Sequence, residues 1–287
     1  MVLDILGIDN DQEANDFLVA NPDFAKQLFN FLQFNLPLSE ENANFAKLAL
    51  ETLMDDGEAD FENKLVKDKS FIGTKADCVL NALINSGNNL FKKTVQAFTE
   101  GKSKFGLRFT AYNNSNDAAD ARTGLPGSDN IITVKVNLAV ANSATSALEL
   151  ASMILHESIH AELHRIKLSN NSAPNSLPSS IYNWYVKMWS YYQAINDSKF
   201  DDPLKVLNQT ATDSQHNLMA FRYITPIANG LREFDDNTHP LDNYKYLAAQ
   251  GLLFYVKQNG YIKKDELNRL NQLSKTITND THKNPCD

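Results

Sequence analysis

The sequence predicts an α+β fold that is mostly helical, with a small β-sheet preceding one long helix. Three observations predict it. Apolar residues recur at helical spacing towards both ends of the chain, two segments near the middle alternate with a period of two, and a capped amphipathic helix follows the second of them. The order of helices, then strands, then helices is typical of the α+β class.

The first 56 residues are expected to form a helical prefix domain. Phe24 and Leu28 lie one helical turn apart within a longer apolar stripe, and Pro22 and Pro37 mark breaks between helices. Ser39, with Glu41 and Asn42 close behind it, is expected to begin a further helix. No residue pattern in this part indicates chemistry.

The main domain is expected to cover 74–287. Residues 57–73 have weak periodicity and are interpreted as a linker. Thr74 is expected to cap a helix. The segments 105–112 and 131–138 alternate apolar with polar side chains, which predicts two half-buried strands joined by a turn-rich loop.

The predicted helix after the second strand carries the strongest local signals. Ser146 and Glu149 have the spacing of a capping box. Leu155 and Ile159 belong to an apolar stripe that runs to about Leu168. Further helices are expected over 181–195, 214–234, 242–257 and 263–274.

Composition excludes several classes of function. The 287 residues carry a formal net charge of −8 and show no basic stripe, so a nucleic-acid partner is not expected. No apolar run approaches the roughly 20 residues of a membrane span. The start of the chain lacks the lysines of a signal peptide, which indicates either a cytoplasmic protein or a segment of a longer exported one.

The two cysteines, Cys78 and Cys286, are too few for a cysteine-based zinc site. They are either two buried thiols or one disulfide, and a disulfide would indicate an oxidising compartment.

The motif H-E-x-x-H occurs at His156, Glu157 and His160 on the long predicted helix. Histidines four residues apart share one helical face, as two ligands of a single zinc ion require. The intervening glutamate can hold the zinc-bound water and accept its proton, so Glu157 is the candidate catalytic base. The alternative is a surface helix with two unrelated histidines.

A catalytic zinc ion needs a third protein ligand. His164 continues the spacing but lies about 12 Å along the axis from His156, so it is expected at the surface or in contact with a ligand rather than on the metal. The metzincin extension is excluded, because Leu163 and Ile166 stand where it needs glycine and histidine.

Two candidates for the third ligand remain open from the residues alone. His216 shares a helical face with Met219 and Tyr223, and Tyr223 could hydrogen-bond the developing oxyanion. Alternatively, His216 is a satisfied polar group beside ordinary core residues. The rival ligand is acidic, with Glu233 foremost. His239 and His282 are expected to be surface residues, because their contexts resemble loops.

The chain resembles zincin-like metallopeptidase domains found at the C-terminal ends of large Bacteroidetes surface and Rhs-type proteins. The resemblance covers about 74–287. It is carried by the segments Thr74–Val79, His156–Glu162, His216–Ala220, Tyr223, Ile227–Ala228, Glu233–Asp235 and the terminal Cys286.

The resemblance implies metallopeptidase-like activity with His216 as the third ligand. It also implies export as part of a longer protein, so the expected location is secreted or at the cell surface, with a cytoplasmic location as the alternative. A disulfide between Cys78 and Cys286 is implied as well.

The leading functional hypothesis is a zinc endopeptidase whose strand over 131–138 pairs with an extended peptide substrate. The aromatic segment 181–192 is either a lid over the site or ordinary core packing. A second hypothesis is a polymorphic-toxin-type protease that acts on one target protein and has an immunity or inhibitor partner. A third, from another class, is an adhesion or binding module in which zinc is only structural.

Overall fold

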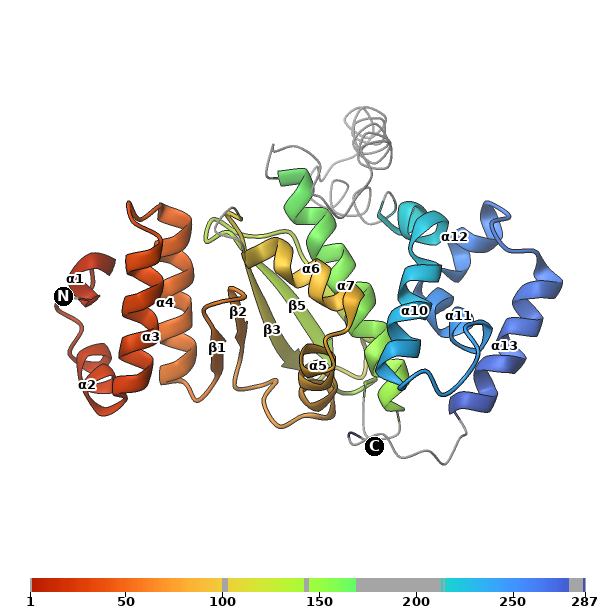
Figure 1. Cartoon of the computed structure of the whole chain (residues 1–287), viewed down its shortest axis with the longest axis horizontal. Coiled ribbons are helices and arrows are strands. Elements are labelled where there is room, and N and C mark those ends of the chain that lie inside the picture. The colour runs from red at the N-terminus through yellow and green to blue at the C-terminus, as the bar shows by residue number, and fades with distance from the viewer. Residues whose placement is uncertain are drawn as a thin grey trace. The chain divides into compact units, whose positions relative to one another are not determined.

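The computed structural model describes residues 2–99, 103–141, 145–168, 213, 215–278 and 286. These residues divide into two compact units. The first comprises Met1–Asp77 and Val95–Ala141, and the second comprises Cys78–Thr94 and Asn142–Asp287. Helices dominate, and the described part contains one five-stranded sheet (Figure 1), so the predicted α+β class is confirmed.

The first unit begins with helices whose caps were predictable. Ser39 accepts a hydrogen bond from the backbone N–H of Asn42 at 3.3 Å, and Pro22 is the first residue of its helix, where its missing N–H costs nothing. The four helices are α1 (Val2–Leu6), α2 (Gln12–Ala20), α3 (Pro22–Phe34) and α4 (Glu40–Met54).

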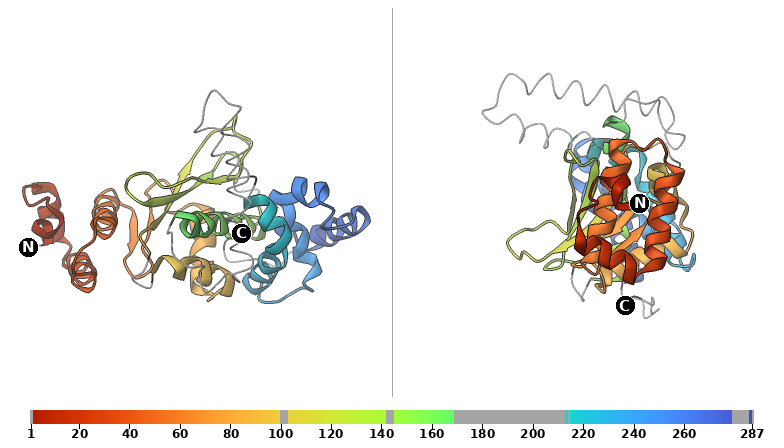
Figure 2. Two further views of the ribbon diagram at one scale, coloured as in Figure 1. Left: turned by 90° about the horizontal axis from the view of Figure 1, so that it is seen from above. Right: turned by 90° about the vertical axis from the view of Figure 1, so that its left-hand side faces the viewer.

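Helices α3 and α4 lie side by side in Figures 1 and 2 and share a hydrophobic core with the sheet. Phe45 of α4 is 1% exposed and packs in one cluster with Val66 and Ile131 of the sheet. The helical prefix and the strands therefore stabilise one another by burying apolar surface together.

The sheet has five strands in the order β1-β2-β3-β5-β4, in which the inner pairs are parallel and the outer pairs antiparallel. The strands are β1 (Glu58–Asp60), β2 (Leu65–Lys67), β3 (Gly106–Tyr112), β4 (Ala121–Thr123) and β5 (Ile131–Asn137). Strands β3 and β5 match the two predicted ones. The segment 57–73 is more than a linker, because it contributes β1 and β2. The sequence did not predict β1 and β2, because each has three residues, too few for an alternating pattern to be recognised.

Strand β5 differs from its prediction in two respects. It is not half-buried, because both of its faces are largely covered and only Lys135 is exposed. It is also not an edge strand, since β4 pairs antiparallel with its outer side from Val134 to Val136. An incoming peptide would therefore have to pair with β1 or β4, the outermost strands in the described part of the sheet.

The second unit is built on α7 (Ala147–Leu168), against which α10 and α11 pack; α13 in turn packs on α11 (Figure 1). Its other described helices are α10 (Ile224–Phe234), α11 (Asp242–Ala249), the short 3₁₀ helix η1 (Gln250–Leu252), α12 (Leu253–Gln258) and α13 (Lys264–Thr278). A further helix covers 215–222. Helices α5 (Lys75–Asn85) and α6 (Asn89–Thr99) each contribute residues to both units.

The predicted capping box at the start of α7 is confirmed. The Ser146 hydroxyl accepts from the backbone N–H of Glu149 at 3.2 Å, and the Glu149 carboxylate accepts from the backbone N–H of Ser146 at 2.9 Å. Two otherwise unpaired N–H groups are thus satisfied at the first turn. The hydroxyl of Ser152 then ties α7 to α11 by donating to the carbonyl of Leu247 at 3.0 Å.

Cys78 and Cys286 form a disulfide, which decides between the two readings left open by the sequence. The bond joins the start of α5 to a position next to the last residue of the chain, across a sequence separation of 208 residues. A link across so long a loop restricts the unfolded chain strongly.

No helix within the described ranges combines the length and apolar character needed to cross a membrane.

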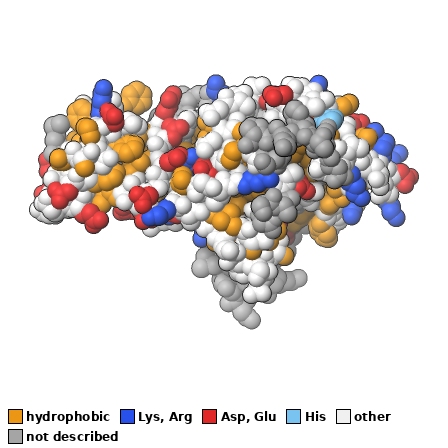
Figure 3. Space-filling model, turned by 90° about the horizontal axis from the view of Figure 1, so that it is seen from below, with side chains coloured by type: hydrophobic (Ala, Val, Ile, Leu, Met, Phe, Trp, Pro, Cys, Tyr) orange, Lys and Arg blue, Asp and Glu red, His pale blue; other side chains and the backbone are white. Residues whose placement is uncertain are grey.

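On the face of the molecule shown in Figure 3, hydrophobic side chains lie among acidic ones over the N-terminal helices. Phe34, at the end of α3, is 83% exposed.

Candidate metal centre

Two histidines on one face of α7 begin the site. His156 and His160 are four residues apart, so their imidazoles lie one turn from each other. Their Nε2 atoms are 3.1 Å apart and their ring centroids 4.8 Å apart. The expectation that this motif places two imidazoles around one point is confirmed in geometry.

The third imidazole comes from the helix over 215–222. The Nε2 atom of His216 lies 3.4 Å from Nε2 of His156, and one nitrogen from each of the three rings lies within 4.8 Å of the others. Two nitrogens bound to one tetrahedral zinc ion at about 2.0–2.1 Å would be about 3.3 Å apart. The three histidines can therefore hold one metal ion.

The environment of these rings keeps them neutral. Burial lowers the pKa of His156 well below the ordinary 6.5, that of His160 to about 4 and that of His216 to about 3. The neighbouring imidazoles lower the pKa values of His156 and His216 further. A metal ion needs the neutral form of imidazole, so at neutral pH the three rings need not lose protons to bind one.

These lowered pKa values predict how the stability of the metal-free protein depends on pH. In the unfolded chain the imidazoles regain a pKa near 6.5, so between about pH 6.5 and 4 the unfolded state binds more protons than the folded state. The free energy of unfolding should therefore fall as pH falls through this range. The measurement is the urea midpoint of chelator-treated protein from pH 7.5 to 5, above the range in which most carboxylates titrate. A flat profile there would contradict the burial of neutral histidines.

The ring of His160 is oriented by Gln215. The side-chain carbonyl of Gln215 lies 2.5 Å from Nδ1 of His160, and its amide nitrogen lies 3.2 Å from Nδ1 of His164. His164 is 5% exposed. His164 is therefore not a surface residue. As the alternative prediction expected, it lies next to the site, where it contacts Gln215, and it does not belong to the three-histidine group.

Glycine at position 251 allows a close approach to His156. A Cβ atom there would lie 2.9 Å from Cε1 and 3.2 Å from Nδ1 of that ring. These distances are too short for any residue with a side chain unless the ring moves. The backbone of the 3₁₀ helix η1 at Gly251 therefore lies directly against the ring of His156.

Replacing Gly251 with alanine should displace the imidazole of His156 and weaken metal binding by roughly tenfold or more, in the range of other substitutions that disturb ligand orientation. Gly124→Ala is the matched control, since a Cβ at Gly124 has nothing within 4 Å. Competition titration with a chromogenic chelator measures both. Equal zinc affinity in the two variants would show that Gly251 does not set the ring position.

Glu157 and Tyr223 are the two residues to which the sequence assigns a catalytic role. Glu157 follows His156 directly and is 7% exposed. Tyr223 is half-buried, and burial together with the charge of Glu162 raises the pKa of its phenol above the usual value. The role of Tyr223 at an oxyanion stays a prediction.

Among the described residues, Tyr255 contacts His216 through its ring. Their ring centroids are 5.2 Å apart, and the phenol donates to Asp213 at 2.6 Å. The sequence analysis missed Gln215, Gly251 and Tyr255. Only Gln215 carried a signal, its position next to His216, because the other two reach the site through tertiary packing.

The remaining candidates lie elsewhere. The carboxylate of Glu233 accepts from the backbone N–H of Asn89 at 2.9 Å, so the rival ligand instead caps the start of α6. His239 is partly exposed, and its ring is 6.4 Å from that of Tyr244. His282 and the aromatic segment 181–192 lie outside the described residues.

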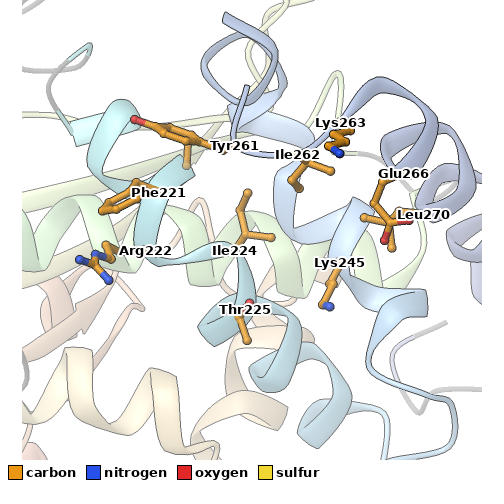
Figure 4. Close-up of a pocket in the computed structure, with 11 residues that line it drawn as sticks. Phe221, Arg222, Ile224, Thr225, Lys245, Tyr261, Ile262, Lys263, Glu266 and Leu270 are labelled. Atoms are coloured by element: carbon orange, nitrogen blue, oxygen red, sulfur yellow. The ribbon is translucent and has the colours of Figure 1, made fainter. Parts of the chain in front are cut away.

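A separate hollow of about 480 Å³ lies between the helix over 215–222 and the start of α13 (Figure 4). The rings of Phe221 and Tyr261, 5.3 Å apart, lie at one side of it, and Lys245 and Lys263 belong to the charged part of its lining. None of the three histidines lines it, so this hollow is distinct from the candidate metal centre.

No protein-family model, no curated protein and no solved structure matches this chain. Any functional assignment must therefore start from the residues of the site themselves.

Proposed function

We propose that the chain is a zinc-dependent peptide-bond hydrolase with His156, His160 and His216 as metal ligands. The observation that carries this proposal is the convergence of three neutral imidazoles, with Nε2 separations of 3.1 and 3.4 Å. The buried Glu157 follows the first of these histidines in the H-E-x-x-H motif. Three imidazoles are a ligand set of known catalytic zinc sites, and imidazole suits zinc among the available metals.

When bound by the three histidines, a zinc ion would lower the pKa of a water to about 7 and would polarise the scissile carbonyl. Glu157 would then accept a proton from the attacking water and pass it to the departing amine, as the glutamate of an H-E-x-x-H helix does. Tyr223 would donate a hydrogen bond to the oxyanion. Its raised pKa supports this role, because the phenol stays protonated at neutral pH.

The number of ligands favours catalysis over a purely structural metal. Closed structural zinc sites have four protein ligands, whereas catalytic sites have three and leave one position for water. Within the described ranges the group contains three histidines and no cysteine or carboxylate. An adhesion module stabilised by zinc is therefore the second candidate.

The sequence resemblance supports a peptide or protein as the substrate and export as part of a longer chain. The disulfide between Cys78 and Cys286 adds support for export, because such bonds persist in oxidising compartments. A toxin-type protease with an inhibitor or immunity partner is the narrower form of this proposal.

Metal removal tests the proposed function. Chelator-treated protein should lose hydrolysis of a quenched casein substrate, and one equivalent of zinc should restore it, whereas magnesium should not. The control is His239→Ala treated in the same way, which should behave like wild type. Hydrolysis that survives complete removal of zinc would refute a zinc hydrolase.

A further inference from the structure

Gln215 lies between two buried histidines of α7 that are one helical turn apart. Its side-chain carbonyl faces Nδ1 of His160 at 2.5 Å, and its amide nitrogen faces Nδ1 of His164 at 3.2 Å. All three side chains are at most 6% exposed, so these hydrogen bonds form with little competition from water.

The chemistry of the amide fixes where the proton of His160 lies. A carbonyl oxygen can only accept a hydrogen bond, so Nδ1 of His160 must carry the proton in this arrangement. Its Nε2 atom then has a free lone pair, and this is the atom that lies 3.1 Å from Nε2 of His156. Gln215 thus selects the tautomer of His160 that a metal ion requires.

An amide side chain has nearly the same shape when it is rotated by half a turn. In the reversed orientation its NH₂ group would face Nδ1 of His160 and would drive that proton to Nε2, where it would block the metal. His164 opposes the reversal, because its Nδ1 accepts a hydrogen bond from the amide nitrogen of Gln215, and after a reversal the proton of His164 would also have to move to Nδ1.

We propose that Gln215 and His164 are positioning residues that act in series on His160, with Gln215 setting its tautomer and His164 setting the direction of the amide. The proposal rests on the proposed metal site and deepens it. It gives a role to the third histidine of α7, which the four-residue spacing alone would have made a ligand. Neither residue belongs to the group of three histidines that could hold the ion.

Zinc affinity, measured by competition titration in a set of variants, tests the proposal. Gln215→Leu removes the acceptor and should weaken binding by 10- to 100-fold, the usual effect of losing such a partner. Gln215→Glu keeps an acceptor towards His160 and should stay within about threefold of wild type.

The decisive comparison places His164→Phe in two backgrounds. In the wild-type background it should weaken zinc binding, because the hydrogen bond from the amide of Gln215 to His164 is lost. In the Gln215→Glu background it should have no effect, since both carboxylate oxygens accept and no wrong orientation exists. His164→Asn, which can still offer an acceptor, should restore the affinity that His164→Phe loses.

Nitrogen-15 NMR of the metal-free full chain measures the tautomer of His160 directly. His160 should be the Nδ1–H tautomer in wild type and a mixture in Gln215→Leu. A loss from His164→Phe that is equal in both backgrounds would overturn the proposal, because it would reflect packing alone. Failure of wild type to bind zinc would refute the proposed function, while the metal-free spectra would still decide whether Gln215 sets the tautomer.

Discussion

Replacing Glu157 with glutamine should lower kcat by roughly 10²- to 10⁴-fold, the contribution typical of a general base, while zinc stays bound at one ion per chain. Glutamine is nearly the same size as glutamate, but its amide cannot accept the proton of the metal-bound water. The three proposed metal ligands should stay in place and the fold should not change, because Glu157 does not belong to the group that could hold the metal ion. The measurements are steady-state hydrolysis and zinc content of the same preparation.

Glu233→Gln is the control for the loss of a glutamate charge. The carboxylate of Glu233 accepts hydrogen bonds from the backbone N–H and from the side-chain amide of Asn89. The proposed mechanism gives Glu233 no role. A glutamine at this position keeps one carbonyl oxygen as an acceptor. This variant should retain both zinc and activity. Equal kcat in the Glu157 and Glu233 variants would remove Glu157 from the mechanism.

Replacing His216 with alanine should weaken zinc binding by about a hundredfold or more. Apparent zinc affinities of about 10–16 kcal/mol in four-ligand peptide sites correspond to roughly 2.5–4 kcal/mol per ligand. Only His156 and His160 would remain of the described cluster. Competition titration measures the change.

His239→Ala provides the matched comparison, since His239 is partly exposed and lies outside the cluster. It should bind zinc like wild type. Because His216 also contacts the ring of Tyr255, circular dichroism of both variants must show an intact fold. Unchanged zinc affinity on loss of His216 would remove it from the site.

The parts of the site that lie within one element could be predicted from the sequence. Ser146 and Glu149 cap α7 through contacts three residues apart, and the spacing of His156 and His160 fixes their common face. Such features depend on helical geometry alone, so no knowledge of the tertiary fold is needed.

The parts that depend on packing between elements could only be proposed or were missed. His216 is 60 residues from His156 in sequence, and the helical pattern around it left Glu233 open as a rival ligand. The closeness of Gly251 to His156 follows from how η1 packs on α7, which no local pattern records.

The sheet shows the same limit. The alternation in β3 and β5 spans seven residues each and was visible in the sequence, whereas β1, β2 and β4 have three residues each. Because β4 arises from a turn-rich loop, nothing in the sequence indicated that the outer side of β5 would be covered.

X-ray absorption at the zinc edge of the zinc-loaded protein tests the central claim most directly. The three-histidine site predicts three imidazole nitrogens and one further light atom from water, all at about 2.0–2.1 Å. A spectrum with sulfur ligands or with fewer than three imidazoles, or a purified chain that takes up no zinc, would contradict a centre formed by His156, His160 and His216.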